Sequence, residues 1–155
     1  MESKYCEYCG HLLNNETAGT QTRYRCINCN HLKFYDPKLA VAVLILIGSK
    51  LVMMKRGVEP ELGRWAFPSG FVDRGEIVQD AAIREVLEET GLDISIDGLI
   101  GLYSLKGNPV ALAVYAGQVR GGSLRPGTDA TEVALFSPSE LPPLPFPHDL
   151  QIIED

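Results

Sequence analysis

The sequence predicts an α+β domain of mixed β-strands around one dominant helix, preceded by a small cysteine-rich module. Three observations lead to this prediction. All four cysteines of the 155-residue chain lie within its first 29 residues. Strand-like apolar runs stand on both sides of a single amphipathic helical segment, and glycine or proline turns separate them. We therefore expect two domains, a module over residues 1–36 and a larger domain over residues 37–155.

The cysteines form two pairs, Cys6-x-x-Cys9 and Cys26-x-x-Cys29, separated by 16 residues. A two-residue spacer lets both thiolates of a pair face one point, and two pairs complete the tetrahedron that zinc prefers. Disulfides do not suit a reducing cytosol, and one redox-active pair leaves the other pair unexplained. We therefore predict a zinc ribbon with a structural Zn²⁺ bound by all four thiolates.

Charge and hydropathy limit the kinds of partner that we expect for the protein. Residues 1–36 carry four basic and four acidic side chains, and the whole chain has a formal charge of −6. Proteins that bind nucleic acid through phosphates have basic surfaces, so we expect no nucleic-acid partner. The longest apolar run, residues 39–47, is too short to cross a bilayer, and the N-terminus lacks the apolar stretch of a secretory signal. We expect a cytoplasmic protein with no membrane association.

The first part of the larger domain has strand patterns. Pro37 biases the residue before it toward extended structure and so closes the module. Residues 39–47 are an almost unbroken apolar run, typical of a strand buried on both faces. Gly48-Ser49 then predicts a turn into a hairpin partner over residues 51–55. A short strand over residues 64–67 is expected after the following loop.

The dominant helix is predicted over residues 77–89, which contain no glycine or proline and place apolar residues at helical spacing. Gly91 is positioned to end it. Further strands are expected over residues 93–104, 110–119 and 132–136. Ser137-Pro138-Ser139-Glu140 then has the form of a capping box and predicts a short helix, followed by an extended tail over residues 141–147.

Three carboxylates give this helix its chemistry. Glu85, Glu88 and Glu89 stand at i, i+3 and i+4, so they project from one face within about 5–6 Å of each other. Carboxylates this close repel unless a cation lies among them, and a hard divalent ion such as Mg²⁺ suits oxygen ligands. A solvated acidic face is the alternative, but it does not explain the neighbouring arginine and glycines.

Four further residues surround these carboxylates. Arg84 lies one turn before Glu88 and can orient a carboxylate. Glu76 precedes the helix and can reach the same cluster. Gly70 and Gly75 let the loop fold tightly and bring a backbone carbonyl near the metal.

The stretch resembles the Nudix box at every defined position, Gly70-x5-Glu76-x7-Arg84-Glu85-Val86-x-Glu88-Glu89-x-Gly91-Leu92. With the paired cysteines, the chain resembles the zinc-ribbon branch of Nudix hydrolases. The resemblance implies an α/β/α sandwich with a mixed sheet. It also implies metal-dependent cleavage of the diphosphate linkage in a nucleoside diphosphate joined to another moiety, which gives two monophosphates.

The resemblance also implies roles for the residues of the box. It makes Glu85 and Glu89 the primary ligands of Mg²⁺ or Mn²⁺, with Glu88 joining them and Gly70 offering its carbonyl. Arg84 and Glu76 are expected to support these ligands.

Residues outside the box give further candidates. Glu132 resembles a glutamate that follows the box in many family members as metal ligand or general base, with an ordinary surface residue as the alternative. Arg56 is a candidate for binding phosphate. Trp65 and Phe67 are candidates for stacking on a nucleobase, with core packing as the alternative. His148 has no visible partner in the sequence and receives no role.

The substrate is predicted by comparing two subgroups. NADH pyrophosphatases carry Ser-Gln-Pro-Trp-Pro-Phe-Pro soon after the box, and residues 105–114 contain no such motif. Residues 143–147 echo it only faintly, more than fifty positions past Gly91. The chain more closely resembles ADP-ribose and FAD pyrophosphatases, so ADP-ribose or FAD is the expected substrate. Hydrolysis of NADH or nucleoside triphosphates, or a non-catalytic nucleotide-sensing role, are the alternatives. Relatives are often dimers, which makes a homodimer an expectation.

Overall fold

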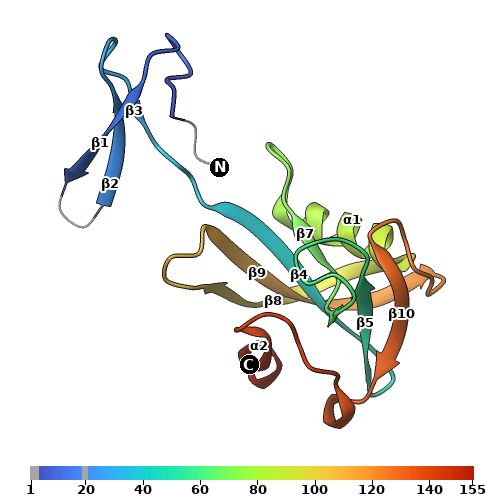
Figure 1. Ribbon diagram of the computed structural model, residues 1–155. Coiled ribbons are helices and arrows are strands. Elements are labelled where there is room, and N and C mark those ends of the chain that lie inside the picture. The colour runs from blue at the N-terminus through green and yellow to red at the C-terminus, as the bar shows by residue number, and fades with distance from the viewer. Residues whose placement is uncertain (1–3, 19–20) are drawn as a thin grey trace. The chain divides into compact units, whose positions relative to one another are not determined.

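The computed structural model describes residues 4–18 and 21–155. They divide into two compact units, Met1–Asp36 and Pro37–Asp155 (Figure 1). The first unit contains a three-stranded sheet in the order β1-β2-β3, with antiparallel neighbours. Its strands are β1 (Leu13–Ala18), β2 (Gln21–Cys26) and β3 (Leu32–Lys33).

The second unit is built on a seven-stranded mixed sheet. Its main path runs β10-β5-β4-β9-β8, with β6 paired to β5 and β7 paired to β4. Only β4 and β9 run parallel, and every other pair is antiparallel. The strands are β4 (Lys38–Ile47), β5 (Lys50–Arg56), β6 (Trp65–Ala66), β7 (Ser69–Phe71), β8 (Leu92–Ser104), β9 (Val110–Gly122) and β10 (Ala130–Phe136).

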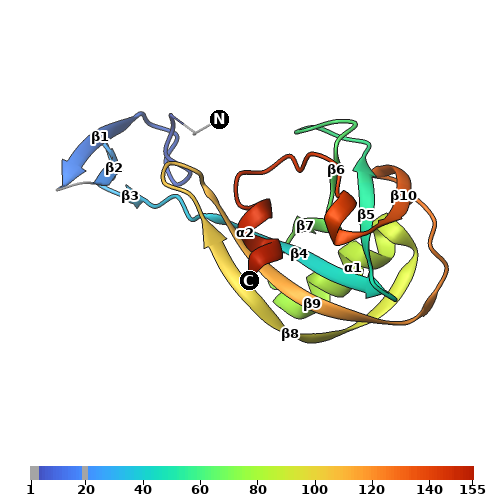
Figure 2. The same ribbon diagram turned by 90° about the horizontal axis from the view of Figure 1, so that it is seen from below.

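Two helices cover opposite faces of this sheet, α1 (Val78–Thr90) and α2 (Asp149–Glu154), as Figures 1 and 2 show. Alternate residues of β4 point to each face because the side-chain period of a strand is two. Val41 and Val43 pack with Val86 of α1, whereas Ala42 packs with Ile152 of α2. The predicted α+β fold, an α/β/α sandwich with a mixed sheet, is therefore confirmed.

The prediction for α1 is correct to within one residue. Ile77 has extended backbone angles and caps the first turn without a side-chain hydrogen bond. At the other end Gly91 adopts φ 70°, a left-handed conformation that glycine tolerates best, and its N–H donates to the Leu87 carbonyl at 2.9 Å. The buried side of the helix carries Ala81, Ala82 and Val86.

Four local features differ from the predictions. Gly70 is expected in a loop, but Ser69–Phe71 form strand β7 beside β4. The hairpin of β4 and β5 is only two pairs long, Leu46 with Leu51 and Ile47 with Lys50. Beyond that point β4 pairs with β9 on one edge and with β7 on the other, and the two helices cover its two faces. The pattern beginning at Ser137 gives a single 3₁₀ turn, Pro138–Glu140, and the Ser137 side chain makes no capping hydrogen bond.

The fourth difference is α2, which the sequence patterns did not predict. A six-residue segment shows too little periodicity to be recognised, and the proline-rich stretch before it favours an extended tail. Burial of Ile152 against the sheet stabilises the helix in place of intrinsic propensity. Within the described residues, no helix has the length and hydropathy needed to cross a bilayer.

Candidate active site

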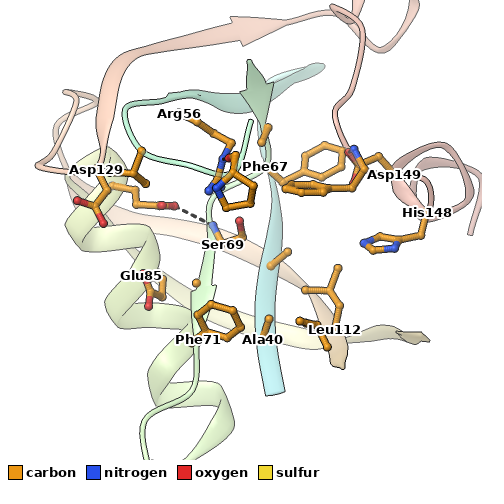
Figure 3. A pocket seen from close by; sticks show the side chains of 18 of the residues that line it. Ala40, Arg56, Phe67, Ser69, Phe71, Glu85, Leu112, Asp129, His148 and Asp149 are labelled. Atoms are coloured by element: carbon orange, nitrogen blue, oxygen red, sulfur yellow. Dashed lines mark hydrogen bonds between the residues drawn. The ribbon is translucent and has the colours of Figure 1, made fainter. Parts of the chain in front are cut away.

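A cavity of about 590 Å³ lies in the second unit, between α1 and the C-terminal segment. Figure 3 shows Glu85 and Asp129 on one side of it and His148 and Asp149 on the other, with Phe67 between them. The carboxylates therefore occupy one end of a space large enough for a nucleotide-sized ligand.

Glu89 is the most deeply buried of the three helix carboxylates, with 5% of its surface exposed. Its Oε2 accepts a hydrogen bond from the Ser69 peptide N–H at 2.7 Å, the dashed line in Figure 3. Burial raises the pKa of Glu89 to about 8, and the nearby Glu85 charge adds to the effect. Burial also raises the pKa of Glu85. Both residues line the cavity; Glu85 is paired with Arg84, whereas Glu89 has no ion pair among the residues that the structure describes.

Gly70 lies against the Glu85 carboxylate. A Cβ at position 70 would stand 2.1–2.3 Å from the carboxylate atoms of Glu85, so only glycine permits this approach. Strand β7 and the helix thus bring a peptide group and two carboxylates together. Oxygen donors of this kind suit a hard divalent cation, which would also supply the positive charge that the buried carboxylates lack.

Arg84 holds the acidic cluster in place through several bonds. Its Nε donates to Glu76 Oε1 at 2.8 Å, and its Nη1 donates to Glu85 Oε1 at 2.8 Å and to Glu88 Oε2 at 3.2 Å. The hydrogen bonds from Arg84 lower the pKa of Glu76 to about 2. Nη2 also donates to the Phe71 carbonyl at 3.1 Å, which ties the loop to the helix. Glu88 is the outermost of the three helix carboxylates, with its side chain 55% exposed.

Residues 123–129 follow β9 and run along the C-terminal end of α1. The peptide N–H groups of Ser123, Arg125 and Gly127 donate to the carbonyls of residues 91, 90 and 89 at 2.9–3.1 Å. Gly127 is required here because a Cβ would stand 1.5 Å from the Glu88 carbonyl oxygen. This segment ends by placing Asp129 in the cavity wall, where its charge contributes to the raised pKa of Glu89.

Glu132, a candidate from the sequence, does not line this cavity. It lies on β10 opposite Lys55, and its Oε1 accepts a hydrogen bond from Lys55 Nζ at 2.7 Å. The register of β10 and β5 fixes this pairing, so Glu132 is directed to a surface ion pair. Asp129, three residues earlier, occupies the position near the carboxylates. Asp129 could not be identified from the sequence, because no helical or strand spacing links it to the box.

The three substrate-binding candidates from the sequence do not all line the cavity. Arg56 and Phe67 line the cavity, and the Arg56 guanidinium lies 5.7 Å from the centre of the Phe146 ring. The Arg56 Nε donates to the Pro60 carbonyl at 2.7 Å, which sets its direction. Trp65 lies outside the cavity and packs edge-on against Phe136 at 5.0 Å. For Trp65 the structure therefore favours the core-packing alternative.

The four cysteines of the first unit converge as expected. Their Sγ atoms all lie within 4.8 Å of one another, and three of the separations are 3.4–3.7 Å. These are too long for disulfides, but tetrahedral zinc with Zn–S bonds of about 2.3 Å requires sulfurs about 3.8 Å apart. A hydrogen bond from the Cys29 peptide N–H lowers the pKa of Cys26 to about 6, which favours the thiolate that a metal binds.

Comparison with known proteins agrees with this geometry. Residues 36–154 match the family model described as NUDIX domain. The chain is 38% identical to an ADP-ribose pyrophosphatase of Methanocaldococcus jannaschii over 79% of this chain and 74% of that protein. It is 31% identical to a putative 8-oxo-dGTP diphosphatase of Bacillus subtilis over 73% and 75%. A NUDIX hydrolase structure from Nitrosomonas europaea superposes with a TM-score of 0.82 and 29% identity, covering 90% of this chain and 81% of the other.

Proposed function

Because the chain belongs to the NUDIX family and is a Nudix hydrolase, a pyrophosphatase, we propose that its substrate is ADP-ribose. The products are AMP and ribose 5-phosphate. The relation to the Methanocaldococcus jannaschii ADP-ribose pyrophosphatase carries this choice, since it extends over about three quarters of both chains. The cavity supports it, because its volume of about 590 Å³ is in the range of pockets that enclose a ligand of this size.

Nudix enzymes use a divalent metal ion, and the donors at one end of the cavity fit Mg²⁺ or Mn²⁺. Glu85, Glu89 and the Gly70 carbonyl are the proposed ligands, with Glu88 as an outer participant. When bound, the ion neutralises charge on the diphosphate oxygens and acts as a Lewis acid. Arg84 holds Glu85 and Glu76 in position, and the Ser69 peptide N–H does the same for Glu89.

Two residues of the cavity wall complete the proposed mechanism. Arg56 binds a phosphate of the substrate, since its guanidinium lines the cavity and its Nε is already anchored to Pro60. Asp129 acts as the general base and accepts the proton of the attacking water. This role requires a carboxylate near the reacting phosphorus. Asp129 is preferred to Glu132 because Glu132 is paired with Lys55 outside the cavity.

A second candidate is pyrophosphohydrolysis of nucleoside triphosphates. The 31% identity with the putative 8-oxo-dGTP diphosphatase favours it, and that relation also covers about three quarters of each chain. Both candidate reactions use the same carboxylates, so only the preferred substrate distinguishes them.

A hydrolysis screen tests the proposal. The purified protein is assayed with Mg²⁺ and then with Mn²⁺ on ADP-ribose, FAD, NADH and nucleoside triphosphates, and products are identified by mass. Release of AMP and ribose 5-phosphate from ADP-ribose, with the highest kcat/KM of the panel, supports the proposal. A higher kcat/KM for a nucleoside triphosphate, FAD or NADH contradicts it and names the preferred class instead.

The first unit, residues 1–36, has a separate proposed role as a structural zinc ribbon. Four thiolates at tetrahedral spacing support zinc binding. Residues 1–36 have no excess of basic side chains, so their charge gives no support for nucleic-acid binding. Metal analysis of protein purified without added metal should find about one zinc per chain, and Cys6→Ser with Cys29→Ser should abolish it.

A further inference from the structure

Arg56 lines the cavity with most of its hydrogen-bonding capacity unused. Its Nε donates to the Pro60 carbonyl at 2.7 Å, and the side chain has no other hydrogen bond and no ion pair among the residues that the structure describes. A guanidinium carries five N–H donors, so the four on its terminal nitrogens remain free for a ligand. One hydrogen bond, however, leaves the group able to turn about that bond. A second contact is what would keep the free donors in one direction.

The Phe146 ring provides this second contact. Arg56 Cζ lies over the ring, 5.7 Å from its centroid, within the range of a cation–π interaction. The face of an aromatic ring attracts the guanidinium charge without neutralising it. The charge and the terminal N–H groups are therefore kept for an anionic ligand, whereas a carboxylate in the same place would engage both.

Phe146 is itself held by buried neighbours. Its peptide N–H donates to Asp149 Oδ2 at 2.9 Å, and the Asp149 N–H donates back to the Phe146 carbonyl at 3.1 Å. Asp149 is only 4% exposed, and Ile152 of the same helix packs in the core below the sheet. The Phe146 ring also lies within 13° of parallel to the His148 imidazole, with centroids 6.3 Å apart. The ring thus belongs to an ordered part of the cavity wall.

The supported guanidinium lies close to the residues proposed for hydrolysis. Gly57, the next residue along the chain, donates its peptide N–H to the Asp129 carbonyl at 2.8 Å. Arg56, Asp129 and Glu89 all line the cavity, and Figure 3 labels the first two. A cation and several carboxylates therefore surround one end of the cavity, as the binding of a diphosphate with its metal ion requires.

We propose that Phe146 is a positioning residue, whose ring orients the Arg56 guanidinium toward the phosphate groups of the substrate. The inference rests on the proposed function, which assigns Arg56 to a phosphate. It gives the C-terminal segment a part in diphosphate binding that is exerted through Arg56.

Titration calorimetry with α,β-methylene ADP measures the effect without turnover. A CH₂ group replaces the bridging oxygen of its diphosphate, and the nucleotide otherwise matches the ADP portion of ADP-ribose, FAD and NADH. With Mg²⁺ present, Phe146→Leu should raise the Kd about two- to fivefold, the effect of losing one cation–π contact. Phe146→Tyr keeps an aromatic face and should stay within about twofold of the wild type.

A double-mutant cycle separates positioning of Arg56 from a direct contact with the ligand. Arg56→Gln alone should raise the Kd at least about tenfold, the effect of losing a charge-assisted hydrogen bond. In the Arg56→Gln background, Phe146→Leu should then change the Kd less than about 1.5-fold, because the group that the ring orients is gone. A ring that stacked on the ligand, or that only stabilised the fold, would have the same effect in both backgrounds.

A matched control exists in the first unit. Arg23 Cζ lies over the Phe34 ring at the same 5.7 Å, and neither residue lines the cavity, so Phe34→Leu should leave the Kd unchanged. In steady-state hydrolysis of the best substrate, Phe146→Leu should raise KM and leave kcat within about twofold, as expected for loss of uniform binding.

The outcomes distinguish this inference from the proposed function. Equal effects of Phe146→Leu in the two backgrounds would overturn the inference alone. So would wild-type affinity in Phe146→Leu when Arg56→Gln weakens binding. Wild-type affinity in Arg56→Gln would overturn both the assignment of Arg56 and the inference. The expected cycle would support the inference even if the hydrolysis screen identifies FAD or NADH as the preferred substrate.

Discussion

The two ends of the cavity differ in the polarity of the residues that line them. At the carboxylate end, Arg84 and the Ser69 peptide N–H hold the acidic side chains from several directions. At the other end, Phe67, Leu112 and Ile152 line the cavity and belong to one apolar cluster. The first end thus presents charged groups in fixed positions, whereas the second presents apolar surface to a ligand. Variants at the two ends should therefore affect turnover and selectivity separately.

The largest expected effect is at the carboxylate end. Glu89→Gln keeps the size of the side chain and removes its charge, so kcat should fall at least about 100-fold, more than is usual for residues that only support a metal ligand. Steady-state hydrolysis of the best substrate measures this. The variant should remain folded, because a pKa of about 8 already keeps the Glu89 carboxyl mostly protonated at pH 7 without the metal. Activity near that of the wild type would contradict the ligand assignment.

The next effect concerns the approach of β7 to α1. Gly70→Ala puts a methyl group onto the Glu85 carboxylate, so Mg²⁺ affinity and kcat should each fall about 10- to 100-fold. Mg²⁺ titration of the rate measures both. Gly98→Ala is the matched control, because a Cβ there meets nothing within 4 Å. Equal behaviour of the two variants would show that the contact between Gly70 and Glu85 has no role in metal binding.

An effect of similar size distinguishes the two candidate bases. Asp129→Asn should lower kcat about 100-fold, the lower range for loss of a general base, and should leave AMP affinity within about twofold. Glu132→Gln should change kcat less than about twofold, since it breaks only an exposed ion pair. The ratio of kcat values for the two variants, measured at saturating substrate, decides between them. The reverse order would restore Glu132 as the base.

The smallest effect is a pH dependence of stability without added Mg²⁺. The folded protein keeps a proton on Glu89 up to about pH 8, whereas an unfolded glutamate loses it near pH 4.5. The folded state thus binds more protons in this window, so the free energy of unfolding should fall as pH rises from about 4.5 to 8. Urea unfolding at several pH values measures this slope. Glu89→Gln should have a shallower slope, and an unchanged slope would contradict the assignment.

The carboxylate end could be predicted from the sequence because its parts are close together along the chain. Glu85, Glu88 and Glu89 share one helix face by spacing alone, and Gly70 reaches them over a short loop. The cysteine cluster was predictable for the same reason. Strand β4 was equally clear, since a continuous apolar run indicates burial on both faces.

The other end could not be predicted because it is assembled from distant segments. Leu112 comes from β9 and His148 from the start of a six-residue helix, and only the sheet order brings them together. Asp129 was missed in favour of Glu132 because the register of β10 with β5, absent from any local pattern, decides which carboxylate faces the cavity. The long-range pairing of strands thus determines which side chains line the cavity, and residue spacing along the chain could not predict it.

The hydrogen bonds between residues 123–127 and the end of α1 have a consequence for changes in chain length. The N–H groups of every second residue (123, 125 and 127) donate to the carbonyls of residues 91, 90 and 89. The segment therefore acts as a fixed spacer between Asp129 and Glu89. Inserting one residue between Ser123 and Asp129 would shift this register and withdraw Asp129 from the cavity. The turn at Gly48 and Ser49 is exposed, and none of the backbone hydrogen bonds among the described residues ties it to a helix. Natural insertions and deletions should therefore accumulate at the turn and be absent from the spacer.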